Sequence, residues 1–212
     1  MQERQSQQVF ININYISDAI KGIRGEFVRK ILHFMVAIVP ILANIDKTLT
    51  IFLLATAIIF YTIMEKLRQE GVYVLLISDL TAFASRERDK GHFVMGPVTL
   101  ALGAMLAVSL YPEPASRLAI YALAFGDGLA SLMGRFFRGP KLPFTGGKTL
   151  IGSLSCLVAV FIVSWRVLGN PWQALLLAVV ATVLEVFPTQ DFDNILMPVG
   201  TGFCAMLLLS LS

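Results

Sequence analysis

The feature that most constrains this chain is a succession of long apolar segments. Seven of them follow the first 29 residues, and each approaches the roughly 20 mostly apolar residues that a helix needs to cross a bilayer. They run over 30–45, 48–65, 93–111, 115–136, 149–168, 171–187 and 194–211. A soluble domain of 212 residues cannot bury the apolar surface implied by 56% hydrophobic residues and a mean hydropathy of +0.74. The sequence therefore predicts an all-α, polytopic integral membrane protein with about seven transmembrane helices.

The distribution of positive charge predicts which way the helices run. Fourteen of the 17 Lys and Arg residues lie at or before the start of the first segment, after the second segment, or at or after the end of the fourth, whereas Lys47, Arg117 and Arg166 lie on the opposite side. Because Lys and Arg are in excess in cytoplasmic loops, we expect a cytoplasmic N-terminus. An odd number of spans then leaves the C-terminus outside. In a prokaryote, the membrane concerned would be the cell membrane.

Two further segments are apolar without being long enough, or uniform enough, to span. In residues 1–28, apolar residues recur at helical spacing from Phe10 to Phe27, with Lys21 and Arg24 between them. This pattern predicts an amphipathic helix in the membrane interface, preceding a single transmembrane domain over residues 29–212. Residues 72–84 are too short for a span and favour an interfacial or re-entrant segment. The polar start of the sequence lacks the apolar run and cleavage site of a signal peptide.

The charge and cysteine content exclude some functions. The net charge is +3 and no run of five basic residues occurs, so we expect no nucleic-acid partner. Cys156 and Cys204 both lie in apolar segments and are predicted to be buried thiols.

Polar residues gather at the helix ends that the charge pattern assigns to the cytoplasm. The outer loops carry almost nothing comparable, so any chemistry is expected at the cytoplasmic face. The residues concerned are Arg29, Lys30, His33, Glu65, Arg68, Arg86, Glu87, Arg88, Asp89, Gly126, Asp127, Ser131, Arg135, Lys148, Ser153, Glu185, Asp193 and Asn194.

The most informative part of this set begins within the fourth segment. Gly126 and Gly134, with an alanine midway between them, share one helix face through their spacing of four, and small residues there let a backbone or a ligand approach closely. Asp127, Ser131 and Arg135 form the adjacent polar face. An acidic residue within the membrane is costly and marks a functional candidate.

A glycine-containing loop then leads into the fifth segment. Gly146 and Gly147 precede Lys148 and Thr149, and Gly152 and Ser153 follow in the first turn of the next helix. Free backbone N–H groups at a helix N-terminus, beside a lysine and hydroxyl groups, suit a chain of phosphates. The spacing is not that of a Walker A loop, which follows a strand.

Acidic residues surround the loop before the last segment. Glu185 precedes this loop, and Asp191, Asp193 and Asn194 lie at its end. Carboxylate and amide oxygens near a phosphate site suit Mg²⁺, which prefers oxygen ligands. Asp127, Asp193 and Asn194 are the predicted metal-binding set.

Each of these assignments has a purely structural alternative. Arg29 and Lys30 are also typical of positive-inside anchors, and Glu65 with Arg68 is also an ordinary i,i+3 pair. Gly126 and Gly134 also suit helix packing alone, and Asp193 with Asn194 also suits a helix cap. His33 favours a packed residue over a catalyst.

The order and spacing of these residues resemble the family of dolichol kinases, phytol kinases and CTP-dependent diacylglycerol kinases. The resemblance runs from about residue 26 to the end of the chain. It rests on Arg29-Lys30-x-x-His33, Glu65-x-x-Arg68 and Arg86 to Asp89, and above all on GDGLASLMGRFFRG followed by KTLIGS. Glu185 and the pair Asp193-Asn194 complete it.

The resemblance implies an integral membrane kinase that transfers the γ-phosphate of CTP to a lipid alcohol, with Mg²⁺ or another divalent cation. The catalytic candidates are Asp127, Lys148, Arg29, Lys30, Glu65 and Glu185, with the general base open between Glu65 and Glu185. The nucleotide-binding candidates are Gly126, Ser131, Gly134, Arg135, Gly146, Gly147, Thr149, Gly152, Ser153 and Arg86. The acceptor is a polyprenol, a phytol-like alcohol or diacylglycerol, and a homodimer is left open.

Two other functions remain as alternatives. Phosphatidate cytidylyltransferases share the pattern of Asp127, Ala130, Gly134, Arg135, Lys148, Thr149 and Gly152, but their C-terminal block differs from EVFPTQDFDNILMP here. A non-enzymatic transporter or lipid-binding protein would also explain intramembrane charge. A transporter, however, favours polar groups near the bilayer midplane, not at one face.

Overall fold

The computed structural model describes residues 25–75, 78, 81, 91–137, 139–189 and 192–211. The chain divides into two compact units. The smaller unit combines the residues up to Arg29 with Met64–Val94, and the larger combines Lys30–Ile63 with Met95–Ser212. Within the described ranges there is no β-strand, and the one extended pairing is an isolated antiparallel bridge between Lys141 and Thr149.

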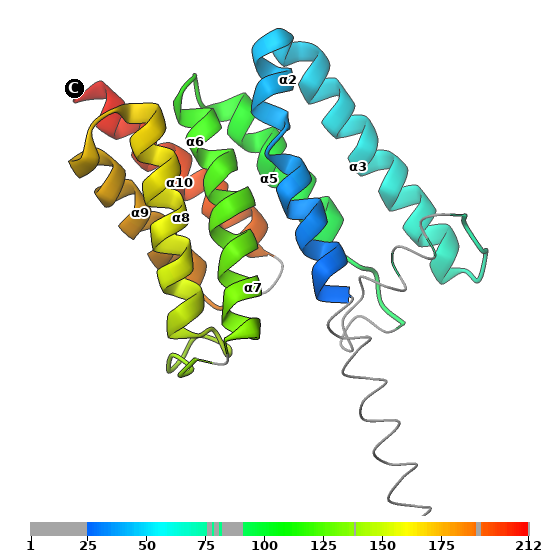
Figure 1. The fold of residues 1–212 in the computed structure, drawn as a ribbon. Coiled ribbons are helices and arrows are strands. Elements are labelled where there is room, and N and C mark those ends of the chain that lie inside the picture. Colours follow the sequence, from blue (N-terminus) through cyan, green and yellow to red (C-terminus); the bar gives the residue numbers. More distant parts are fainter. Residues whose placement is uncertain are drawn as a thin grey trace, which may run out of the picture. The chain divides into compact units, whose positions relative to one another are not determined.

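Each of the seven predicted apolar segments is helical (Figure 1). A helix over Gly25–Ile45 comes first and ends in α2 (Val39–Ile45). It is interrupted by a turn at residues 37–38, just before Pro40, which has no N–H to donate to the preceding turn. The remaining helices are α3 (Lys47–Gln69), α5 (Gly96–Leu110), the consecutive segments α6 (Ala115–Tyr121), η2 (Ala122–Asp127) and α7 (Gly128–Phe136), and then α8 (Leu150–Leu168), α9 (Pro171–Val186) and α10 (Asp193–Ser210).

Four of the described helices are long and apolar enough to cross a membrane. They are Gly25–Ile45, Lys47–Gln69, Leu150–Leu168 and Asp193–Ser210, whereas α5 and α9 are apolar but shorter. The all-helical prediction is confirmed, and the apolar helices agree with a membrane protein. The count of seven spans and the cytoplasmic N-terminus stay predictions.

Two sequence predictions fall mainly outside the described residues. Most of the amphipathic segment over 1–28 is not described, and only part of 72–84 is. The interfacial or re-entrant character of these segments therefore stays a prediction, as does the domain boundary at residue 29.

The turn between α8 and α9 follows directly from three residues. Gly169 ends α8 in the left-handed conformation, with φ of 72°, which glycine adopts without strain. Asn170 then caps α9 by accepting the N–H groups of residues 172 and 173, and Pro171 occupies the first helical position. This short turn makes α8 and α9 antiparallel neighbours, so Ser153 near the start of α8 lies beside Glu185 near the end of α9.

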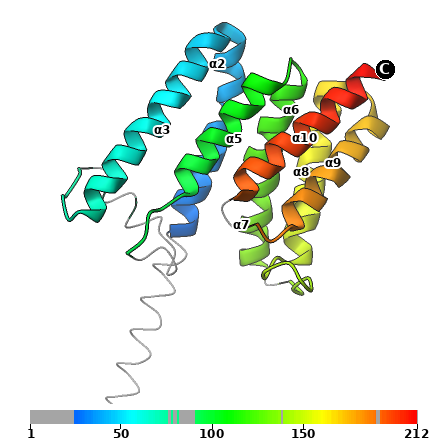
Figure 2. The same cartoon turned by 180° about the vertical axis from the view of Figure 1, so that it is seen from behind.

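Small residues bring the helices of the larger unit together. A buried cluster of Ala122, Ala130, Cys156, Val160, Ala178, Ala181 and Met197 joins η2, α7, α8, α9 and α10. A Cβ atom on Gly152 would lie 2.6 Å from the carbonyl oxygen of Ala130, and one on Gly103 would lie 2.0 Å from the carbonyl oxygen of Asn194. These two glycines therefore allow α8 to approach α7 and α10 to approach α5, and Figure 2 shows α10 beside α5 and α9.

A π-helix, which the sequence analysis did not predict, separates α6 from α7. It covers Ala122–Asp127 and ends at the acidic residue of the fourth segment. Short π-helical insertions often occur at functional sites, because they locally change which side chains face inward. Asp127 thus leaves the π-helix as a buried side chain.

Candidate functional site

A buried ionic cluster surrounds Asp127. Lys30 Nζ donates a hydrogen bond to Asp127 Oδ2 at 3.0 Å, and His33 Nε2 lies 3.0 Å from the same oxygen. Lys30 and His33 are three residues apart on one helix, so both side chains reach the same partner. The side chains of Lys30 and Asp127 are only 5% and 10% exposed, so this ion pair is largely shielded from water.

The cluster continues from His33 to α10 and α5. His33 Nε2 lies 3.1 Å from Asn194 Oδ1, at the first turn of α10. The amide nitrogen of Asn194 donates to Thr99 Oγ1 at 3.0 Å and lies 3.5 Å from the carbonyl oxygen of Gly96, both on α5. Three helices therefore meet at one buried network of polar side chains.

A second ionic group lies where α8 begins and α9 ends. Lys148 Nζ lies 3.0 Å from Glu185 Oε1 and 3.8 Å from Asp193 Oδ2, and it also donates to the main-chain carbonyl of Glu185. Ser153 Oγ donates to Glu185 Oε2 at 3.2 Å. The carboxylate of Glu185 is thus buried between a lysine and a hydroxyl group.

Electrostatics connect the two groups into one site. Burial of Lys148 disfavours its charged form, but the neighbouring carboxylates outweigh burial and raise the pKa of Lys148 above its usual value. In decreasing order of their effect, these carboxylates belong to Glu185, Asp127 and Asp193. Lys148 therefore carries a full positive charge at neutral pH, within the field of the carboxylate that Lys30 and His33 hold.

The donor set limits the kind of metal site that can form. Among the described residues, no group of three or more His, Cys, Asp or Glu side chains is placed to hold a metal ion. Both contacts that described side chains make to the Asp127 carboxylate fall on Oδ2, which leaves Oδ1 for a ligand. Mg²⁺ is commonly held by one or two carboxylates together with substrate phosphates and water. The open oxygen of Asp127 is compatible with a cation that arrives with phosphate, and metal binding by Asp127, Asp193 and Asn194 stays a prediction.

Glu65 and Arg29, two other catalytic candidates, belong to the smaller unit. The carboxylate of Glu65 is 0% exposed and accepts hydrogen bonds from Arg68 Nε at 2.8 Å and Arg68 Nη2 at 2.7 Å. It also accepts the N–H of Val94 at 3.1 Å. Arg29 forms an i,i+3 ion pair with Glu26. These contacts engage Glu65 and Arg29 within the smaller unit, and a catalytic function for either residue stays a prediction.

Several predicted nucleotide-binding residues make contacts within or between helices. Ser131 Oγ donates to the carbonyl oxygens of Asp127 and Gly128 in its own helix. Thr149 caps α8 by accepting the N–H of Gly152 at 3.1 Å. These contacts leave a nucleotide-binding function for Ser131, Thr149 and Gly152 as a prediction.

The predicted glycines fall into two groups. A Cβ on Gly126 would lie 2.7 Å from Met197 Cε, and one on Gly134 would lie 2.5 Å from Thr149 Oγ1, so both occupy helix contacts. Gly146 and Gly147 have φ values of 69° and 101° in the loop before α8, a conformation that glycine adopts readily. Arg135 lies in the last turn of α7, whereas Arg86 lies outside the described residues.

His33, which the sequence analysis interpreted as a packed residue, and Thr99, which it did not name, both belong to this network. The spacing of His33 from Lys30 was a usable signal, because residues three apart share a helix face. Thr99 gave no signal, because its contact with Asn194 depends on the close approach of α5 to α10.

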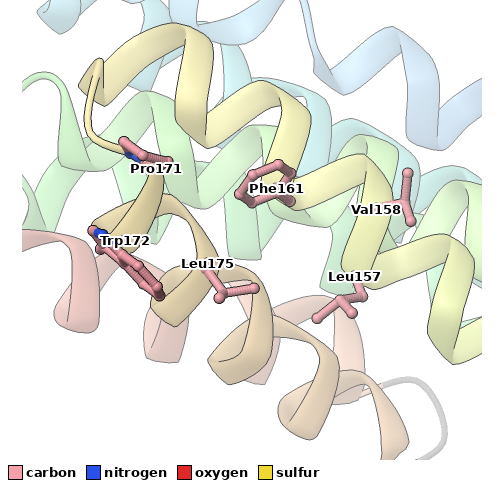
Figure 3. A pocket seen from close by; sticks show the side chains of 6 residues that line it. All are labelled: Leu157, Val158, Phe161, Pro171, Trp172 and Leu175. Atoms are coloured by element: carbon pink, nitrogen blue, oxygen red, sulfur yellow. The ribbon is translucent and has the colours of Figure 1, made fainter.

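An apolar cavity of about 360 Å³ lies apart from these polar residues, between α8 and α9. Figure 3 shows its lining side chains, which are Leu157, Val158, Phe161, Pro171, Trp172 and Leu175. None of them carries a charge, so the cavity offers hydrocarbon contacts and no chemistry of its own.

Comparison with known proteins supports a family for this chain. It is 29% identical over 151 residues to the probable chloroplastic phytol kinase 1 of Oryza sativa subsp. japonica, covering 63% of this chain and 48% of the relative. It is 27% identical over 155 residues to the chloroplastic phytol kinase 1 of Arabidopsis thaliana, covering 65% and 51%. It is 26% identical over 141 residues to the chloroplastic farnesol kinase of Arabidopsis thaliana, covering 58% and 46%.

The chain spans about half the length of the curated relatives it matches. No family model matches the sequence, and no solved structure matches the chain. The similarity to phytol and farnesol kinases confirms the resemblance drawn from the sequence motifs.

Proposed function

We propose that this protein is a lipid-alcohol kinase that transfers the γ-phosphate of CTP to an alcohol in the membrane. The observation that carries this proposal is the joining of Asp127, Lys30, Lys148 and Glu185 in one buried ionic site of a helical membrane protein. The similarity to phytol and farnesol kinases supports a phosphoryl acceptor of this chemical class. CTP as the donor follows from the family resemblance.

The phosphate groups would be held by the lysine at the start of α8. Lys148 is positively charged, and it lies beside the positive end of the α8 helix dipole. Phosphoryl transfer requires mainly positioning and neutralisation of charge, which a lysine and a helix N-terminus both supply. Lys30 would add a second positive charge, held in place by Asp127.

A divalent cation is part of the proposal. Two lysines face three carboxylates in the described network, so the network alone carries a net negative charge and would repel the triphosphate of CTP. Mg²⁺ bound with the nucleotide would make the net charge of the site positive, and Asp127 and Asp193 would hold the ion. The ion would neutralise charge that develops on the phosphate oxygens.

Glu185 is the residue that we propose to receive the proton of the acceptor hydroxyl. In the reaction, a bond forms between the acceptor oxygen and the γ-phosphorus, the bond from that phosphorus to the bridging oxygen breaks, and CDP leaves. Glu185 Oε2 already accepts a hydrogen bond from the hydroxyl of Ser153, so it can accept one from a substrate hydroxyl. Glu65 is less suitable, because Arg68 and Val94 occupy its carboxylate.

The membrane arrangement completes the proposal. We propose seven spans with a cytoplasmic N-terminus, an interfacial N-terminal helix, and an active site that opens to the cytoplasm. The acceptor would enter from the bilayer between helices, so that its hydrocarbon chain stays in an apolar environment. The acceptor could be a polyprenol, a phytol-like alcohol or diacylglycerol.

A donor and acceptor panel tests this function. Purified protein in detergent is incubated with Mg²⁺, with each of the γ-labelled nucleoside triphosphates in turn, and with phytol, farnesol, a longer polyprenol or diacylglycerol. We expect label in the lipid phosphate with CTP and at least one of these alcohols. The absence of labelled lipid with every combination would contradict the kinase proposal. A purely lipid-binding or transport protein would also show no stabilisation against heat by CTP with Mg²⁺.

A further inference from the structure

We propose that Thr99 is a positioning residue, which acts through Asn194 to fix the imidazole of His33 as an Nε2–H donor to Asp127. The kinetic part of this inference rests on the proposed function, because Asp127 is the carboxylate assigned there to the metal and the phosphates. The structural part stands independently of any activity, because it follows from the direction of each hydrogen bond.

The first link fixes the direction of the Thr99 hydroxyl. Its Oγ1 lies 3.1 Å from the carbonyl oxygen of Gly96 and 3.3 Å from that of Met95, and both of these groups can only accept. The hydroxyl proton is therefore directed at its own helix. The lone pairs of Oγ1 remain to accept a hydrogen bond from outside α5.

The second link fixes the orientation of the Asn194 amide. One end of this side chain faces both Thr99 Oγ1 and the carbonyl oxygen of Gly96. Because a carbonyl only accepts, this end must be the NH₂ group, since an amide oxygen there would oppose another acceptor. The opposite end, Oδ1, therefore faces His33.

The third link fixes the tautomer of His33. Nε2 lies 3.1 Å from Asn194 Oδ1 and 3.0 Å from Asp127 Oδ2, and both oxygens only accept. The proton must therefore be on Nε2, because an unprotonated nitrogen would face two acceptors. Asp127 and Asn194 Oδ1 both require a proton on Nε2, and Thr99 holds Asn194 so that its oxygen, not its NH₂ group, faces this proton.

The close approach of α5 and α10 makes this chain of contacts possible. Gly103 lies one helical turn after Thr99 on the same face of α5, and a Cβ there would lie 2.0 Å from the carbonyl oxygen of Asn194. Glycine at this position lets the backbone of α10 come near enough for Asn194 to reach Thr99.

This chain of contacts assigns Asn194 a function other than metal binding. Both ends of its amide are already engaged, by His33 at the oxygen and by α5 at the nitrogen. Replacing a residue that hydrogen-bonds to a metal-binding or catalytic side chain, and so orients it, typically lowers activity or metal affinity about 10- to 100-fold. We therefore expect Thr99 to affect the reaction without touching a substrate.

The test uses three substitutions in the full chain. Thr99→Val keeps the shape of the side chain but removes its oxygen, and Thr99→Ser keeps the hydroxyl. Thr201→Val is the matched control, because Thr201 is 0% exposed on the same helix as Asn194 and its Oγ1 has no hydrogen-bond partner among the described residues.

The first readout is nitrogen NMR of the histidine rings, in protein labelled with ¹⁵N-histidine. The chain has two histidines, so a His92→Asn variant assigns the His33 signals. We expect a proton on Nε2 of His33 in all four proteins, at one chemical shift in the wild type, in Thr99→Ser and in Thr201→Val, and at a different shift in Thr99→Val, because Asn194 there loses the acceptor that orients it. An unprotonated Nε2 in the wild type, or an unchanged pattern in Thr99→Val, would overturn the inference.

The second readout is steady-state kinetics with the alcohol that the wild type accepts. We expect Thr99→Val to lower kcat about 10-fold with the KM for the alcohol unchanged, and Thr99→Ser to restore it. A kcat of Thr99→Val equal to that of Thr201→Val would contradict a positioning function. If the wild type transfers no phosphate, the proposed function fails, while the NMR result still decides whether Thr99 fixes His33.

Discussion

Asp127 lies in a buried ion pair and is the carboxylate that we propose to hold the metal, so its replacement should have two separable effects, on stability and on activity. The carboxylate faces Lys30 and His33 at 3.0 Å each, in surroundings where the lysine side chain is only 5% exposed. Asp127→Ala leaves a buried ammonium group without its partner and an imidazole without one of its acceptors. Removing one member of a buried ion pair typically destabilises a protein by about 3–5 kcal/mol. We expect a loss of this size for Asp127→Ala.

The partner residue should show a smaller effect. Lys30→Met removes the ammonium group but leaves Asp127 with the hydrogen bond from His33. The expected loss is about 1.5–3 kcal/mol, the usual range for one hydrogen bond to a charged group. In the double variant Lys30→Met with Asp127→Ala, no lysine charge is buried at this position, so stability should recover toward that of the wild type.

Denaturant or thermal unfolding in one detergent, followed by tryptophan fluorescence, measures the four proteins of this double-mutant cycle. We expect the losses to be strongly non-additive, as they are for residues in direct contact. The double variant should regain stability and yet transfer no phosphate. If Asp127→Ala is as stable as the wild type, or if the two losses simply add, Lys30 and Asp127 are not a buried pair.

Three other expectations follow from single residues. Glu185→Gln should lower kcat by at least about 100-fold in a folded protein, whereas Glu65→Gln should lower stability and leave the kcat of the folded fraction unchanged. Kinetics and unfolding measured on the same preparations test this, and a large loss of kcat in Glu65→Gln alone would make Glu65 the general base. Thr201→Val should raise the unfolding free energy by about 1 kcal/mol, since it removes a buried hydroxyl without a described partner. An unfolding free energy below that of the wild type would show that the hydroxyl has a stabilising partner. Gly152→Ala should destabilise by about 1–3 kcal/mol, because the new Cβ would lie 2.6 Å from a main-chain oxygen of α7, and Gly96→Ala, with open space around it, should be near neutral in the same melt.

The helices and part of the site could be predicted from the sequence, because both depend on local patterns. Apolar length located the long helices that the structure describes, and the succession of Gly169, Asn170 and Pro171 is sufficient to end one helix and begin the next. Asp127 stood out because an acidic residue in an apolar segment requires a compensating partner. The structure supplies that partner as Lys30, which the resemblance had already selected.

The remaining contacts depend on the distance between helices, which local patterns do not contain. Thr99 is an ordinary helical threonine until Gly103 lets α10 approach α5. The π-helix over Ala122–Asp127 changes the helical phase at the site, and spacing arguments that assume a regular helix cannot anticipate it. Gly126 and Gly134 suited either a nucleotide or a neighbouring helix, and the structure places other helix residues against both.

The most direct test of the central proposal follows two phosphates of CTP at once. Wild-type protein with Mg²⁺ and phytol or farnesol is given CTP labelled at the α-phosphate in one reaction and at the γ-phosphate in a parallel one, and phosphatidic acid replaces the alcohol in a second pair. We predict that γ-label enters the lipid alcohol while α-label stays in CDP. Entry of α-label into lipid with release of pyrophosphate when phosphatidic acid is present would contradict the kinase, and would instead indicate a cytidylyltransferase.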